Sequence, residues 1–241
     1  MLARAAVDAG IDTVAATPHL RADFPDVHPE ELADRCRVLR AAMAQHEIPL
    51  RVVSGAETSL VWALQCDRQQ LALATYAQHA ESILIETPND VTGIQELLYV
   101  LRAQGLRVIL AHPERSSGFH ASPDHLEALC CQGVVPQVDA GSLVHRPDSS
   151  VRRLAERVVS SGHPAVIASD AHRGQSWRPV TILAQAASAA ATLVGPARAA
   201  WMTSEAPLAI VEGRELPDAP PSRPARRSWW KAGRGRPVRA A

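Results

Sequence analysis

The sequence lacks any apolar stretch close to the ~20 consecutive residues that a membrane-spanning helix needs. Its first ten residues, MLARAAVDAG, contain an acid and do not form the apolar core of a signal peptide. These two absences predict a cytoplasmic protein with no membrane span.

Cysteine is also scarce, with four residues in 241. None of the four is in a C-x-x-C motif, and the adjacent pair Cys130 and Cys131 is poorly placed to bridge itself, so we expect no disulfide framework. No arginine follows Cys36, Cys66 or the pair at the sixth position, which is where the phosphate loop of cysteine-dependent phosphatases needs one. Catalysis by a thiolate is therefore not expected.

The overall charge of zero conceals an asymmetry. From Pro217 onward seven basic residues stand against Asp218, a balance of +6, so residues 1–216 carry −6. Hydrophobic residues make up 46% of the chain, enough for one sizeable core. We predict one domain over residues 1–216 and a disordered, solvated tail rich in Pro and Arg over 217–241. Trp229 and Trp230 lie in that tail, where we expect no nucleic-acid contact.

Short apolar runs alternate with helical patterns along the first 200 residues, which is typical of a parallel α/β sheet or barrel. Runs buried on both faces fit strands that helices cover on each side. A helix at 2–9, closed by Gly10, precedes the first predicted strand. The predicted strands are 13–17, 50–57, 82–86, 107–112, 135–140 and 164–170. The predicted helices that follow are 29–46, 91–104, 123–132, 149–161 and 179–194.

Metal-ligating side chains occur where these strands end. In a parallel barrel all carboxyl ends of strands open on one face, so residues far apart in sequence converge there. Histidine mixed with carboxylate suits Mn²⁺, Fe or Zn²⁺. A single His or Glu at such a position is more often a capping, packing or solvated residue, whereas Asp170 and His172, two positions apart, share one face of extended backbone and form a stronger pair. The joint pattern carries the prediction. The candidate ligands are His19, Glu57, Glu86, His112, Asp170 and His172.

Two arginines are candidates for phosphate binding. Arg115 comes three residues after His112, and a planar guanidinium can hold a phosphate by two hydrogen bonds. Arg178 is a second candidate in a longer loop. The alternative is that Arg115 pairs with one of the many acids of the body. The remaining histidines lack partners at ligand spacing and are expected to be structural or at the surface: His28, His46, His79, His120, His125, His145 and His163.

Six stretches, in order, resemble the PHP (polymerase and histidinol phosphatase) superfamily. They are GIDTVAATPH, GAE, ILIE, LAHPER, QVDAGSL and VIASDAH, and they cover residues 1 to about 200. The resemblance is strongest to the capsular and exopolysaccharide tyrosine-protein phosphatases of bacteria, the CpsB/CapC type. HPER followed some sixty residues later by SDAH is the specific part of the pattern.

The resemblance implies an α/β fold, a distorted (β/α)7 barrel, that holds two or three metal ions, often manganese, with iron or zinc as alternatives. The six candidate ligands match family ligands, Arg115 matches the arginine thought to bind phosphate, and Arg178 is a candidate match for a second. The implied substrate is a phosphotyrosyl protein, a bacterial tyrosine kinase that governs polysaccharide export. An oligomer is left open.

The family begins with a strand that bears a His-x-His pair, followed shortly by an acidic ligand, and this sequence has none of these residues. We therefore expect an N-terminally truncated chain that lacks up to three ligands, and its activity as written is left open. Two other functions are also left open: a small-molecule phosphatase of the histidinol-phosphate kind, and a degenerate, non-catalytic barrel that acts as a binding protein.

Overall fold

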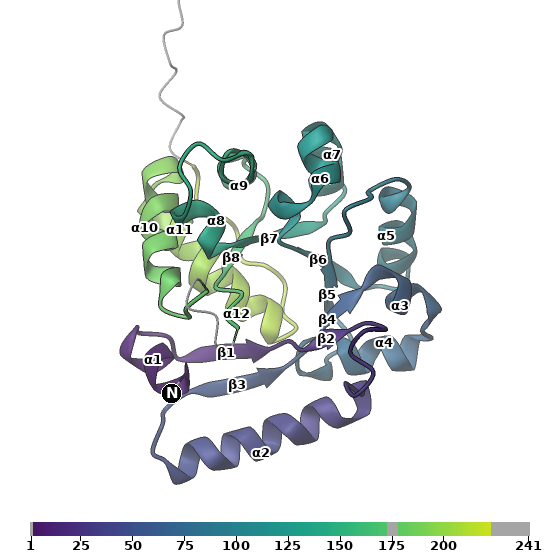
Figure 1. Cartoon of the computed structure of the whole chain (residues 1–241), viewed down its shortest axis with the longest axis vertical. Helices are drawn as coiled ribbons and strands as arrows, with labels where there is room; N and C mark the ends of the chain where they lie inside the picture. The colour runs from purple at the N-terminus through teal and green to yellow at the C-terminus, as the bar shows by residue number, and fades with distance from the viewer. Residues whose placement is uncertain (1, 173–177, 223–241) are drawn as a thin grey trace, which may run out of the picture.

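The computed structural model describes residues 2–172 and 178–222 (Figure 1). Most of the predicted tail, from residue 223 on and including Trp229 and Trp230, lies outside the described residues. No helix in the described part of the chain combines the length and the apolar content needed to cross a bilayer.

In the described part of the chain, parallel strands form two sheets. β1 (Thr13–Ala16) pairs with β3 (Arg51–Ser54) in one sheet. The second sheet has the order β2-β4-β5-β6-β7-β8. Its strands are β2 (His19–Leu20), β4 (Glu57–Ser59), β5 (Ser82–Glu86), β6 (Arg107–Ala111), β7 (Val135–Asp139) and β8 (Val166–Ala168).

The small sheet leads directly into the large one. β1 continues into β2 and β3 into β4, and the strands break where Pro18 offers no backbone N–H. The Gly55 amide donates to the Ala16 carbonyl (3.1 Å) and the Glu57 amide to the Pro18 carbonyl (3.0 Å), so pairing resumes across the break. β1 with β2, and β3 with β4, each form one interrupted strand, which we call a track. Together with β5, β6, β7 and β8, the described residues thus form six parallel tracks side by side.

Helices surround these strands (Figure 1). In the picture α2 lies beneath β3, and α5 stands beside β5 and β6. Short turns of 3₁₀ helix occur at η1 (Pro29–Glu31), η2 (Tyr76–Gln78) and η3 (Pro113–Arg115), and a π turn at η4 (Trp201–Glu205). The α-helices are α1 (Leu2–Asp8), α2 (Leu32–Gln45), α3 (Leu60–Gln65), α4 (Arg68–Ala74), α5 (Ile94–Ala103), α6 (Ser117–Ala121), α7 (Pro123–Cys131), α8 (Ala140–Val144), α9 (Ser150–Ser160), α10 (Ile182–Val194), α11 (Pro196–Ala200) and α12 (Ala206–Val211).

The main core fills the centre of the large sheet. The middle residues of β5 and β6 are all buried, as continuous apolar runs of a covered parallel sheet should be. α5 packs Leu98 and Leu101 against them, three residues apart on one helical face. Burying a Leu or Ile side chain contributes roughly 1.5–3 kcal/mol, so this layer holds the strand ends of the site in place.

The parallel α/β architecture is confirmed, and each predicted strand matches an observed one to within a few residues. One strand differs in its burial. The run at 13–17 was expected to be a core strand, yet all four residues of β1 are half-buried. β3 is its partner among the described residues, so one edge of β1 is left without a strand beside it there. A closed seven-stranded barrel stays a prediction.

The C-terminal part of the body was not foreseen. Residues 196–211 form α11, η4 and α12, whereas the sequence predicted no helix after 194. The Trp201 indole donates to the Pro217 carbonyl (3.1 Å), and Arg198 donates to the carbonyl of Pro220 (3.2 Å). Residues 217–220 thus contact the body, and the boundary predicted at 216 falls inside a bonded segment.

Candidate active site

Three predicted ligands meet where the first three tracks pass side by side. His19 and Glu57 are register partners on β2 and β4, and Glu86 ends β5. His19 Nδ1 lies 3.7 Å from Oε2 of Glu57 and 4.0 Å from Oε2 of Glu86. Nδ1 is buried and has no hydrogen-bond partner among the described residues. A polar atom that faces two carboxylates without touching either leaves room for a cation between them.

His112 approaches the same carboxylate from β6. It follows the last residue of that strand and adopts a left-handed conformation (φ 36°), which is costly for a residue other than glycine. Its Nε2 lies 2.8 Å from Oε1 of Glu57. Glu57 therefore has one oxygen toward His112 and the other toward His19.

The pKa values of Glu57 and His112 shift in opposite directions, that of Glu57 downward and that of His112 upward. Burial alone would raise the pKa of Glu57, but the His112 hydrogen bond and the nearby imidazoles of His19 and His172 bring it below its usual range. Burial would likewise lower the pKa of His112, and the Glu57 carboxylate raises it instead. The geometry thus favours an ionised Glu57, which is the form that binds a metal.

Asp170 and His172 lie beyond β8, next to this group. Asp170 also has a left-handed backbone (φ 45°). The His172 ring centroid is 6.2 Å from that of His19, and its Nδ1 lies 2.9 Å from the backbone oxygen of Asp170. With Nδ1 engaged there, Nε2 is the nitrogen left for another ligand.

Both predicted phosphate arginines converge on Asp170. Oδ2 of Asp170 accepts from Nη1 of Arg178 (2.6 Å) and Nη1 of Arg115 (3.1 Å). Arg178 is buried, whereas the Arg115 side chain is 35% exposed. The alternative of Arg115 paired with an acid is thus realised, and the acid is itself one of the candidate ligands.

Arg21 and Phe24, which the sequence analysis did not single out, contact Glu86 and His19. Arg21 donates from Nη1 to Oε1 of Glu86 (2.6 Å) and is fixed on its other side by Asp23. The Phe24 ring stacks on His19 with centroids 5.1 Å apart and is 41% exposed. These contacts orient Glu86 and His19, and only folding brings the 21–24 loop back over the strand ends.

Asp139 is a further missed residue, although it obeys the rule that found the others. It ends β7, lies 3.7 Å from Arg115 Nη1, and accepts from the Gly141 amide (2.8 Å). Burial raises its pKa. Strand-end position was the signal available, because QVDAGSL ends a predicted strand in an acid.

Glu114, between His112 and Arg115, is fully buried. Its Oε1 accepts from the Asp139 amide (3.0 Å) and from the Ser142 hydroxyl (2.7 Å). Burial raises the pKa of this carboxyl to about 7. Glu114 therefore ties the turn after β6 to the turn after β7 and sets the distance between Arg115 and Asp139.

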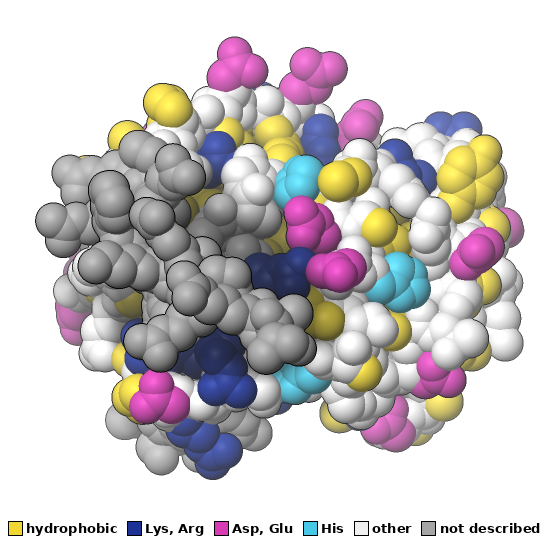
Figure 2. All heavy atoms as spheres, turned by 90° about the horizontal axis from the view of Figure 1, so that it is seen from above, with side chains coloured by type: hydrophobic (Ala, Val, Ile, Leu, Met, Phe, Trp, Pro, Cys, Tyr) yellow, Lys and Arg dark blue, Asp and Glu magenta, His cyan; other side chains and the backbone are white. Residues whose placement is uncertain are grey.

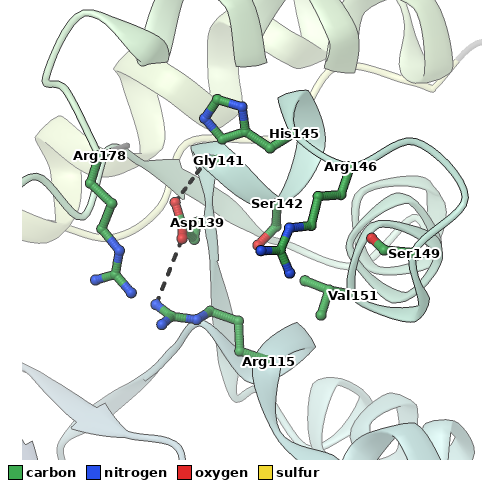
Figure 3. A pocket seen from close by; sticks show the side chains of 9 residues that line it. All are labelled: Arg115, Asp139, Gly141, Ser142, His145, Arg146, Ser149, Val151 and Arg178. Carbon is green, nitrogen blue, oxygen red and sulfur yellow. Dashed lines mark hydrogen bonds and ion pairs between the residues drawn. The ribbon is translucent and has the colours of Figure 1, made fainter. Parts of the chain in front are cut away.

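A cavity of about 520 Å³ opens beside the arginines. Figure 3 shows Asp139 between Arg115 and Arg178, with Arg146 entering from another element. In Figure 2 histidine, acidic and basic side chains border one another near the middle of one face. A mixed cluster of this kind, next to a basic hollow, suits the binding of a cation together with an anion.

The side chains fit a divalent metal. The histidine nitrogen and carboxylate oxygens of His19, Glu57 and Glu86 lie within 4.8 Å of one another. Oε2 of Glu86 and Oε2 of Glu57 face His19, whose Nδ1 is the unpartnered atom. Neutral imidazole with carboxylates is a donor set for Mn²⁺, Fe or Zn²⁺.

A family model described as "Capsular polysaccharide synthesis, CpsB/CapC" matches residues 1–212. The chain belongs to this family. The resemblance read from six sequence motifs is thereby confirmed.

Known relatives agree in sequence and in fold. Tyrosine-protein phosphatase YwqE of Bacillus subtilis is 31% identical over 176 residues, which are 71% of this chain and 68% of YwqE. A chain from the crystal structures of YwqE from Bacillus subtilis and CpsB from Streptococcus pneumoniae superposes with a TM-score of 0.77 at 24% identity. The superposition covers 93% of this chain and 90% of the other. Those two proteins are described as metal-dependent tyrosine phosphatases.

Proposed function

We propose that this CpsB/CapC family member is a metal-dependent protein-tyrosine phosphatase. The observation that carries the proposal is the unpartnered Nδ1 of His19, facing two carboxylates beside a pair of arginines. The naming of its relative YwqE as a tyrosine-protein phosphatase supports the same activity.

The proposed metal ligands are the six that the sequence pointed to: His19, Glu57, Glu86, His112, Asp170 and His172. We propose two or three Mn²⁺ ions, with Fe or Zn²⁺ as alternatives. Bound divalent ions supply Lewis acidity to phosphoryl oxygens and make water more acidic near neutral pH. The six strand tracks are proposed to belong to a distorted (β/α)7 barrel, which would bring all strand ends to one face.

Arg115 and Arg178 are proposed to bind the phosphate. Both now share one oxygen of Asp170, so an entering phosphate dianion competes with that carboxylate for the two guanidinium groups. Arg115, the more exposed of the two, can turn toward the substrate, whereas buried Arg178 holds its position. Their charge offsets the charge of the equatorial oxygens when the phosphoryl group transfers.

The proposed substrate is a phosphotyrosyl protein, a bacterial tyrosine kinase of the capsule or exopolysaccharide system. A cytoplasmic location stays a prediction.

The experiment compares substrates on one preparation of protein loaded with Mn²⁺. We expect a phosphotyrosyl peptide to be hydrolysed with a kcat/KM at least about a hundredfold above those for a phosphoseryl peptide of the same sequence and for histidinol phosphate, a difference of about 2.7 kcal/mol. Faster hydrolysis of histidinol phosphate would establish the small-molecule phosphatase instead. A protein that binds the phosphotyrosyl peptide and hydrolyses none of the three would be the non-catalytic binding protein.

A further inference from the structure

We propose that the 520 Å³ cavity is a second anion subsite, which binds a carboxylate or phosphate side chain of the protein substrate close to the phosphotyrosine. This inference rests on the proposed function. It adds a preference for acidic surroundings of the target tyrosine, which the metal cluster alone does not require.

The cavity has the charge for an anion. Three arginines line it, Arg115, Arg146 and Arg178, against the single carboxylate of Asp139. Asp139 faces Arg115, and Asp170 next to the cavity engages Arg115 and Arg178, so among the described residues these two carboxylates leave the positive charge of Arg146 unbalanced. Residues 1–216 as a whole carry an excess of acid, which makes this cationic hollow a local exception.

Arg146 lines the cavity but does not belong to the proposed phosphate site. Arg115 and Arg178 are both engaged by Asp170. Within residues 2–172 and 178–222, by contrast, no hydrogen bond or ion pair holds the side chain of Arg146. Figure 3 shows it entering the cavity from another element than Arg115 does. A cation left without a partner beside a phosphate site is available to a second anion.

The loop that presents Arg146 is strained and anchored at both ends. Arg146 (φ 47°) and Asp148 (φ 66°) both have left-handed backbones. The His145 amide bonds to the Gly141 carbonyl (2.8 Å), and the Ser149 amide bonds to the carbonyl of Arg146 (3.2 Å). Residues other than glycine adopt this conformation at an energetic cost, and such strain is most common at binding and active sites.

The far wall adds a second source of positive potential. Ser149 caps α9 by accepting from the Arg152 amide (3.1 Å), and Ser149 and Val151 both line the cavity. The eleven-residue helix therefore directs the positive end of its dipole into the space that Arg146 enters. The volume is in the range of sites that enclose a side chain or small ligand.

The test uses three phosphotyrosyl peptides of equal length. One has glutamate on both sides of the phosphotyrosine, the second has glutamine there, and the third has phosphoserine on one side. We expect a kcat/KM about tenfold higher for the glutamate and phosphoserine peptides than for the glutamine peptide, as one charge-assisted contact would give. A preference confined to phosphoserine would identify phosphate as the ligand and also support the subsite.

Arg146→Gln should reduce this preference to nearly one. Arg68→Gln is the matched control, because Arg68 is also an exposed arginine with no hydrogen bond or ion pair among the described residues, and it lies on α4, away from the cavity. The control should keep the full preference. Equal kcat/KM values for all peptides in the parent protein, or an undiminished preference in Arg146→Gln, would overturn the inference.

Binding separates this inference from the proposed function. Fluorescence anisotropy with the same peptides, carrying a non-hydrolysable phosphonate in place of the phosphotyrosine ester, reads the subsite without turnover. If no peptide is hydrolysed, the proposed function fails. The subsite still stands if the glutamate peptide binds about tenfold tighter to the parent protein than to Arg146→Gln. Equal binding would remove it.

Discussion

Nε2 of His112 lies 2.8 Å from Oε1 of Glu57, although the two residues are 55 positions apart in the chain. The contact joins the turn after β6 to the start of β4, across β5. It leaves the other Glu57 oxygen directed at His19. Glu57 is thus shared between two histidines, and we take it as the centre of the site.

Glu57→Gln should weaken Mn²⁺ binding strongly, because the amide keeps the shape and removes the charge between the two histidines. We expect a rise in Kd of at least about a hundredfold, equivalent to roughly 2.7 kcal/mol. Isothermal titration calorimetry measures it. Glu96→Gln, an exposed acid on α5, should leave the Kd unchanged. Similar Kd values for both variants would remove Glu57 from the ligand set.

Arg21→Ala should also weaken metal binding, but less. Arg21 holds one oxygen of Glu86 and leaves the other facing His19, so its loss lets the carboxylate rotate. Loss of a partner that orients a ligand typically costs 10–100-fold in affinity. Arg37→Ala, which breaks an exposed pair on α2, is the control. Tighter binding in Arg21→Ala would mean that the arginine competes with the metal.

Arg115→Ala should lower turnover of phosphotyrosyl peptide while the metal content stays the same. Removing one charged group that stabilises the transferring phosphoryl group costs on the order of 2–4 kcal/mol in the transition state. Arg115→Lys should recover only part, because lysine cannot make the two parallel hydrogen bonds of a guanidinium. Kinetics with metal analysis of each variant decide it, and unchanged kcat and KM in Arg115→Ala would contradict the assignment.

Glu114→Ala should destabilise the fold, since it leaves the Asp139 amide and the Ser142 hydroxyl without their acceptor in the core. We expect a loss of roughly 2–4 kcal/mol in the free energy of unfolding. Glu114→Gln retains an acceptor oxygen and should lose less. Urea denaturation of the metal-free proteins gives both values. Equal stability of Glu114→Ala and the parent would show that the two turns are held by other contacts.

Strand ends were predictable because polar residues interrupt apolar runs at fixed places. The six candidate ligands were found by this rule and converge in the structure, although their ligand roles stay proposals. Asp139 obeys the rule equally and was passed over. Arg21 and Phe24 could not be found this way, because they act from a loop whose return over His19 depends on tertiary contacts.

The sequence likewise predicted some elements of the fold and not others. Continuous apolar runs located the buried strands of the main core, since apolar content and burial coincide there. It failed at 196–211, where Arg198, Trp201 and Met202 are buried among short helices of mixed composition. The first residues after the predicted boundary at 216 also contact the body, which composition did not indicate. The bonds to Pro217 and Pro220 use backbone carbonyls, which every residue has, so no side-chain pattern marks them.

The most direct test of the central claim is the kcat/KM for a phosphotyrosyl peptide, measured as a function of the Mn²⁺ bound to the protein. We predict turnover near background after chelation, restored in proportion to the metal taken up, and not restored in Glu57→Gln at the same Mn²⁺ concentration. Phosphotyrosine hydrolysis that survives complete removal of metal, or metal-loaded protein with no hydrolysis at all, would contradict the account.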